Sequence, residues 1–182
     1  AVDKAADKYA FLQKGGVRAK PIAASVPLTY THIAGIYTFF TGEPCINTNY
    51  AEYTLPYTIA HEYSHQRGIG AEDEADFTAF LILCQSDNPY LQYSAMSEAF
   101  LILSRELYEA DRDAYFDIVD SLPAVVTNDF SVSSKSYSRY SDSQISQVAS
   151  EVNDAYLKAN GMQEGVTSYS RSVILLVAYL NS

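Results

Sequence analysis

The stretch His61-Glu62-Tyr63-Ser64-His65 places two of the chain's three histidines four residues apart. Residues at this spacing lie one above the other on the same face of an α-helix. Two imidazoles on one face can bind a single Zn²⁺, at roughly 2.0–2.1 Å each. Glu62 then lies beside the metal, where its carboxylate can accept a proton from a bound water molecule. The stretch therefore predicts a helix that carries a metal site and a general base. Two ordinary histidines on an exposed helix are the alternative.

The residues on either side favour a short helix with a sharp end. Pro56 suits the first helical turn, where a missing N–H costs little. Gly68, just after His65, indicates the end of the helix. Apolar residues spaced four apart predict a buried stripe: Leu55, Ile59 and Tyr63. A helix that ends here lets the chain turn back and bring a third ligand to the metal.

The next segment, Ala71–Leu83, opens with acidic residues, as a helix N-terminus prefers, and continues into an apolar run. We expect Glu72 to be the third protein ligand, which completes a His₂Glu site with an open position for water. Glu74 is the alternative ligand. Asp76, one turn after Glu72, is expected to hold a ligand histidine in its tautomer. Compensation of the helix dipole is the alternative role of these carboxylates, above all of Asp73.

At this point the residues support a family resemblance. Glu72-x-x-Ala75-Asp76 resembles the Glu-x-x-Ala-Asp element that supplies the third ligand in gluzincin peptidases. Further segments are similar to a bacterial family described as a domain of unknown function and predicted to be zinc metallopeptidases: Phe40–Glu43, Asn47–Asn49, Leu55–Glu62, His65–Gly68, Val152–Lys158 and Gly165–Tyr169. The resemblance implies a zincin-like metallopeptidase domain. A metzincin His₃ site is not expected, because Ala71 stands where its last histidine would fall.

These residues predict a zinc-dependent metallopeptidase with one Zn²⁺ per chain and a peptide or protein as substrate. Zinc lowers the pKa of its bound water toward ~7, and Glu62 acts as the catalytic general base. A further donor should stabilise the oxyanion. The candidates are Tyr169, which the family-like segment places first, and Arg171, Tyr140, Arg139 and His32. The alternatives are a zinc-binding domain without peptidase activity and an interaction module in which the motif is accidental.

Composition limits the partners and the location. The formal charge of −10 and the pI near 4.6 argue against nucleic acid and anionic membrane surfaces as partners. Val173–Leu180, the longest nearly continuous apolar run, is too short to span a bilayer, so no direct membrane insertion by this segment is expected. The resembled family often carries N-terminal membrane helices. It therefore implies an extracytoplasmic domain, anchored through a segment that this chain lacks.

The pattern of the chain predicts one domain, residues 1–182, that is mainly α with a small β-sheet. Expected helices beyond the motif are Val2–Gln13, Tyr90–Leu107, Asp111–Leu122, Asp142–Ala159 and Ser168–Leu180. Ile22–Thr31 is expected to be extended and the serine-rich segment Ser131–Ser143 to be a loop. Cys45–Asn49 is expected to be a short strand.

Three further side-chain expectations follow from the pattern. In zincins, an edge strand before the motif helix pairs with the substrate, so Glu43–Asn49 is the candidate substrate strand, with an ordinary connecting strand as the alternative. Arg67 is expected to pair with Asp73 or Asp76. Cys45 and Cys84 are expected to be small buried residues, with a disulfide as the alternative.

Overall fold

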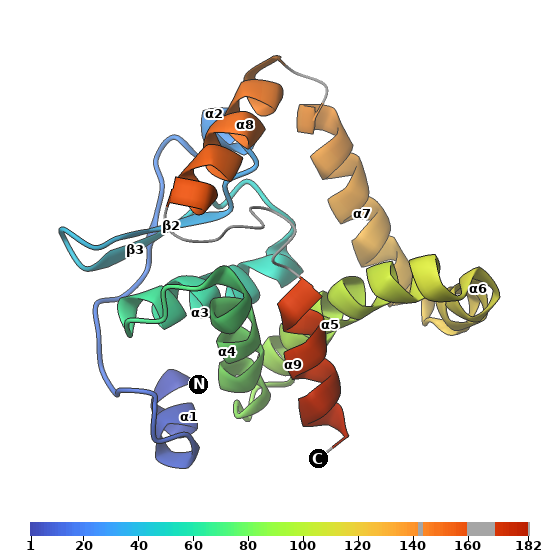
Figure 1. Ribbon diagram of the computed structural model, residues 1–182, viewed down its shortest axis with the longest axis horizontal. Coiled ribbons are helices and arrows are strands. Elements are labelled where there is room, and N and C mark those ends of the chain that lie inside the picture. The colour runs from blue at the N-terminus through green and yellow to red at the C-terminus, as the bar shows by residue number, and fades with distance from the viewer. Residues whose placement is uncertain (142–143, 160–169, 182) are drawn as a thin grey trace.

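The computed structural model describes residues 1–141, 144–159 and 170–181. Helices dominate, and a small three-stranded sheet lies to one side of them (Figure 1). The predicted α+β class is therefore confirmed. The helices are α1 (Val2–Lys8), α2 (Ser25–Thr29), the 3₁₀ turn η1 (Glu52–Thr54), α3 (Leu55–Gln66), α4 (Glu72–Cys84), α5 (Pro89–Ala110), α6 (Arg112–Ser121), α7 (Ala124–Ser141), α8 (Gln144–Ala159) and α9 (Ser170–Leu180). Within the described part of the chain, no helix is both long and apolar enough to cross a membrane.

The sheet contains β1 (Lys20–Pro21), β2 (Gly35–Thr38) and β3 (Glu43–Ile46), in the order β1-β3-β2. β3 pairs with β1 in parallel and with β2 antiparallel. Because β3 has a neighbour on each side, the expectation that Glu43–Asn49 is an edge strand is wrong. The edge strands are β1 and β2, and a tight turn with Gly42 at φ 68° joins β2 to β3.

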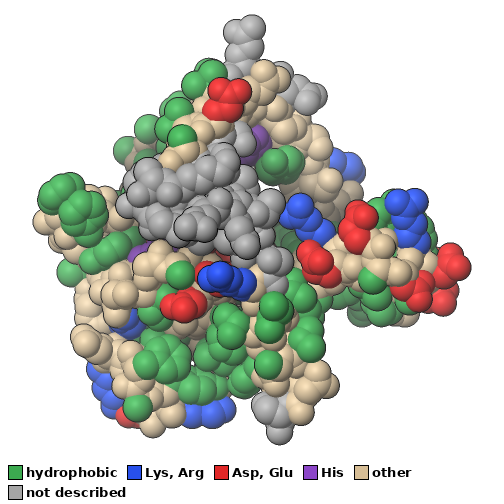
Figure 2. All heavy atoms as spheres, in the orientation of Figure 1, with side chains coloured by type: hydrophobic (Ala, Val, Ile, Leu, Met, Phe, Trp, Pro, Cys, Tyr) green, Lys and Arg blue, Asp and Glu red, His purple; other side chains and the backbone are tan. Residues whose placement is uncertain are grey.

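The core lies where α3, α4 and α5 pack together, with α1 and α9 against α4. Phe80, Ile82 and Leu176 are almost completely buried there. The other side of α3 packs against β2 and β3, so the helix lies between the sheet and the helical core. Figure 2 shows that hydrophobic side chains also gather on the surface over α4 and α9.

The predicted buried stripe of α3 is wrong. Its fully buried positions are Tyr57, Ala60, Glu62 and Ser64, whereas Leu55, Ile59 and Tyr63 are only half-buried. The reason is that the helix has protein on two sides. Its buried residues therefore do not form one stripe at a spacing of four.

Two segments that were expected to be irregular or extended are helical. Within Ile22–Thr31, Ser25–Thr29 forms α2, and the hydroxyl of Thr29 donates to the carbonyl of Ser25 one turn earlier. Most of Ser131–Ser143 continues α7 as far as Ser141. There the serine hydroxyls donate to carbonyls of the preceding turn, as Ser138 does to Ser134, so they do not break the helix.

The remaining helices agree with the expected segments, apart from their ends. The first helix is shorter than Val2–Gln13, because α1 ends at Lys8. α5, α6, α8 and α9 lie within a few residues of the predicted bounds. Cys45 and Cys84 are free thiols on different elements, and both are half-buried.

Candidate metal centre

The site begins with the local conformation of α3 and the turn after it. Pro56 occupies the first turn of α3, as expected, and the helix ends at Gln66. Gly68 adopts φ 87°, a left-handed conformation that glycine takes without strain. The amide of Ile69 then donates to the carbonyl of Ser64, which closes the turn. α4 therefore begins at Glu72, with its first residues facing the end of α3.

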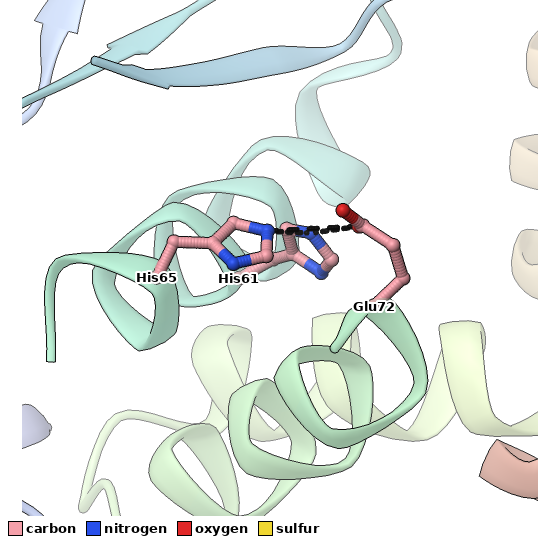
Figure 3. A group of neighbouring side chains, drawn as sticks. All are labelled: His61, His65 and Glu72. Atoms are coloured by element: carbon pink, nitrogen blue, oxygen red, sulfur yellow. Dashed lines mark hydrogen bonds and ion pairs between the residues drawn. The ribbon is translucent and has the colours of Figure 1, made fainter. Parts of the chain in front are cut away.

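Three potential ligand atoms converge between the two helices. His61 Nε2 lies 3.0 Å from His65 Nε2 and 3.1 Å from Glu72 Oε2, and His65 Nε2 lies 3.6 Å from the same oxygen. Figure 3 shows the two rings on α3 and the carboxylate that reaches them from α4. Ligands about 2.1 Å from a tetrahedral zinc ion lie ~3.4 Å from one another, so the observed separations suit such an ion. This group could hold a metal ion.

The hydrogen bonds of the two rings determine which nitrogen atoms face the centre. His65 Nδ1 donates to the carbonyl of Ile69 at 2.7 Å, because a carbonyl oxygen can only accept. His61 Nδ1 donates to the Asp76 carboxylate at 2.8 Å. In the neutral tautomers, both Nε2 atoms therefore present lone pairs toward each other and toward Glu72. Three acceptors converge on one point, which requires a cation or a proton at that point.

The electrostatics of the cluster also indicate a site for positive charge. Burial alone would lower the pKa of His61, but its hydrogen bonds to Asp76 and Glu72 outweigh burial and raise the pKa to about 10. Burial opposes ionisation of Glu72, yet hydrogen bonds from His61 and His65 hold the pKa of its carboxyl well below the usual value. The site nevertheless remains open to solvent, since the Glu72 side chain is 27% exposed.

Glu62 lies on α3 between the two histidines and is 4% exposed. Its Oε2 has no hydrogen-bond partner among the described residues. Burial raises the pKa of this carboxyl above its ordinary value. Gly35, at the start of β2, lies so close that a Cβ there would be 2.4 Å from Glu62 Oε1. The strand therefore fixes one side of the carboxylate, and only glycine leaves room for it.

The end of α3 is tied to the N-terminal segment by Arg67. Its guanidinium donates to the carbonyls of Gln13 and Gly15, and to that of Tyr63 within α3. The expected ion pair with Asp73 or Asp76 is therefore wrong: Asp76 accepts from His61, and Arg67 is occupied by carbonyl oxygens.

Other candidate residues are placed as follows. Glu74, the alternative ligand, is exposed and lies outside the cluster of ligand atoms, whereas Asp73 is buried. Tyr169, the first candidate for the oxyanion donor, lies outside the described residues. His32 adopts φ 58° and stacks on Tyr137 of α7, 4.4 Å between ring centroids.

The other three oxyanion candidates lie on α7 and α9. The hydroxyl of Tyr140 accepts a hydrogen bond from Asn49, and Arg139 lies over the Tyr140 ring. Arg171 on α9 is exposed.

Two contacts at this site could not be predicted from the sequence. The carbonyl of Ile69 orients His65, and the only signal for it was the glycine turn that precedes it. Gly35 lies against Glu62, and nothing near it in the sequence distinguishes it from an ordinary turn glycine.

Comparison with known proteins identifies a family. Residues 1–177 match the family model described as "Protein of unknown function (DUF3810)", so the chain belongs to that family. The resemblance to a domain-of-unknown-function family is thereby confirmed. Neither a curated protein nor a solved structure matches the chain.

Proposed function

We propose that this member of the family is a zinc-dependent peptidase, in which His61, His65 and Glu72 hold one zinc ion and Glu62 is the general base. A single observation carries the proposal. In the neutral tautomers that the two Nδ1 hydrogen bonds favour, two Nε2 lone pairs and a carboxylate oxygen converge within 3.0–3.6 Å. Such a group is stable only around positive charge.

The chemistry of the donors favours a catalytic zinc ion over a structural one. Two imidazoles and one carboxylate are the protein ligands of peptidase zinc sites, which keep a fourth position open. Structural sites take four protein ligands, often cysteines, whereas Cys45 and Cys84 lie outside this cluster. When bound, zinc lowers the pKa of a water molecule toward ~7 and polarises a carbonyl group.

Glu62 has the environment that a general base requires. Its raised pKa makes the carboxylate a better proton acceptor near neutral pH than an exposed glutamate. Oε2 is without a protein partner among the described residues, so it is available to hold a proton. In peptide hydrolysis, Glu62 would accept a proton from the attacking water and deliver it to the leaving amine.

The position of β2 supports an extended peptide as the substrate. β2 is one of the two edge strands of the sheet within the described residues, and its first residue, Gly35, lies against Glu62. A peptide that added a strand to β2 would satisfy backbone groups of that edge. The backbone of the bound peptide would then lie next to Glu62.

The test combines metal analysis with hydrolysis of a peptide library. We expect one zinc per chain in the wild type and in Glu62→Gln, and none in His61→Ala, by elemental mass spectrometry. His32→Ala is the matched control and should keep its metal, because His32 stacks on Tyr137. Only the wild type and the control should cleave peptides.

Each contrary result has a distinct meaning. Full activity in Glu62→Gln would show that the proposed mechanism is wrong. Stoichiometric zinc without cleavage of any peptide would favour the alternative, a zinc-binding domain that is not a peptidase. A wild-type chain that holds no metal after zinc addition and dialysis would exclude the proposed zinc-dependent activity.

A further inference from the structure

An apolar groove lies on the face of the sheet that is turned away from α3. Its volume is about 490 Å³, a size found among ligand pockets of proteins, and its mainly apolar lining includes Leu28 of α2, Ile36 of β2 and Cys45 of β3. Ile36 and Cys45 are directly opposite each other in the sheet, so their side chains lie on the same face. α2 and α3 lie on opposite sides of β2 and β3 (Figure 1). The sheet therefore separates the groove from the metal centre.

The alternation of side chains along β2 connects the groove to Glu62. Gly35 lies on the α3 side of the sheet, because a Cβ there would meet Glu62. Successive residues of a strand point to opposite faces, so Ile36 points away from α3, where it lines the groove. Neighbouring residues of one strand thus face the proposed general base and the groove.

The open edge of β2 presents the backbone groups of Gly35 and Tyr37. The amide of Asn47 donates to the carbonyl of Ala34 at 2.8 Å, so Ala34 is a hydrogen-bonded position in the antiparallel pair with β3. Hydrogen-bonded positions alternate along such a pair, and Ile36 therefore also directs its backbone groups toward β3. The N–H and C=O groups of Gly35 and Tyr37 then point toward the open edge, where an added strand can pair with them.

We propose that the groove is a subsite for an apolar side chain of a peptide that adds to β2. The peptide residue opposite Ile36 would have its side chain on the face of Ile36, with the two Cβ atoms about 4.5–5.5 Å apart, and so at the groove. Its neighbour, opposite Gly35, would lie next to Glu62. The groove and the open edge are thus continuous, since the same strand forms both.

The lining of the groove determines which side chains fit. None of its lining residues is charged, so a charged side chain would lose hydration there without gaining a partner. A leucine would exchange water for apolar contacts. The inference rests on the proposed function and specifies its substrate class: peptides with an apolar residue within one or two positions of the cleaved bond.

Cleavage of a peptide library measures this preference. We expect the wild type to cleave peptides with leucine at this position with a kcat/KM about tenfold higher than the same peptides with serine or aspartate. Ile36→Asp should lose the preference and favour lysine, because a carboxylate then lies at the groove. Val26→Asp is the matched control, since Val26 is 54% exposed on α2 and does not line the groove. It should keep the wild-type preference.

Cys45 gives a second readout that needs no hydrolysis, because its half-buried thiol lines the groove. In zinc-loaded Glu62→Gln, a leucine peptide at ten times its Kd should slow the alkylation of Cys45 by iodoacetamide about tenfold, since about one site in eleven is then empty. The aspartate peptide at the same concentration should have no effect. Cys84 is the internal reference, since it lies at the end of α4 opposite to Glu72 and no peptide should protect it.

The outcomes separate this inference from the proposed function. Unchanged labelling of Cys45 with every peptide, or cleavage without an apolar preference, would overturn the inference. Protection of Cys45 without cleavage would support the subsite and contradict the proposed hydrolysis. A change from dimer to monomer in the sedimentation of Ile36→Asp would also overturn the inference, since the groove would then be a contact between copies. Near-ultraviolet circular dichroism verifies the folding of Ile36→Asp, and the labelling of Cys45 decides if that variant does not fold.

Discussion

The contact between Gly35 and Glu62 gives the sharpest prediction about the site, because the space between them leaves no room for a larger residue at position 35. Gly35→Ala adds one methyl group whose three nearest atoms all belong to Glu62, the proposed general base. The variant therefore separates the position of the base from the binding of the metal.

The structure sets the size of the effect. The new Cβ would lie 2.4 Å from Glu62 Oε1, 2.7 Å from Cγ and 2.8 Å from Cδ. Carbon contacts normally lie near ~3.5–4.0 Å, so the carboxylate must retreat by about 1 Å. A misplacement of this size can reduce a reaction rate by ~10²-fold. Overpacking should also lower the free energy of unfolding by roughly 1–3 kcal/mol.

The assay measures kcat and KM for a peptide substrate, together with zinc content and thermal unfolding. We expect kcat to fall about 100-fold, KM to change little and zinc to remain at one per chain. Gly70→Ala is the control, since a Cβ at Gly70 would meet no atom within 4 Å. Full activity of Gly35→Ala, or loss of zinc together with activity, would refute the reasoning.

The remaining predictions concern the candidate ligands and a half-buried acid, Glu98. Zinc affinity, measured by competition with a chelator, should fall more in Glu72→Ala than in Asp76→Asn, for which a 10–100-fold loss is expected. Glu74→Ala should leave the affinity unchanged, and the reverse ranking would reassign the third ligand. Burial and the nearby charge of Asp76 raise the pKa of Glu98 from 4.5 to about 7. Its ionised form therefore destabilises the fold above about pH 7, and this cost disappears as the pH falls toward 4.5. Glu98→Gln should raise the free energy of unfolding in urea by up to about 3 kcal/mol at about pH 8, and have no effect below pH 4.5. Glu109→Gln, exposed on the same helix, should show no such gain, and an equal gain in both variants would contradict the assignment to Glu98.

The arrangement of the three candidate ligand atoms could be predicted because it depends on local geometry. The spacing of His61 and His65, the stop at Gly68 and the acidic start of α4 all lie within one helix-turn-helix segment. Each of these features follows from the residues next to it. The hydrogen bond of His61 to Asp76 could be predicted in the same way, because Asp76 lies one helical turn after Glu72.

α7 was misjudged because its stability comes from contacts with distant residues. Its serine-rich sequence has weak helical preference. Tyr137 and Tyr140, however, pack on His32 and Tyr30, which lie about a hundred residues earlier in the chain. Composition within a window cannot detect such contacts, so a helix held by tertiary packing was interpreted as a loop.

Glu62, the proposed general base, shows why the motif is only part of the site. Spacing along α3 places Glu62 beside the two histidines, but it does not place the carboxylate. That depends on β2, which approaches closely because Gly35 has no side chain, and on the sheet order that leaves β2 at the edge. A sequence with the same motif and a larger residue at position 35 could bind the same metal and still hold its base in the wrong place. The proposed metal binding and the proposed hydrolysis therefore depend on different residues, and Gly35→Ala is the substitution that should separate them.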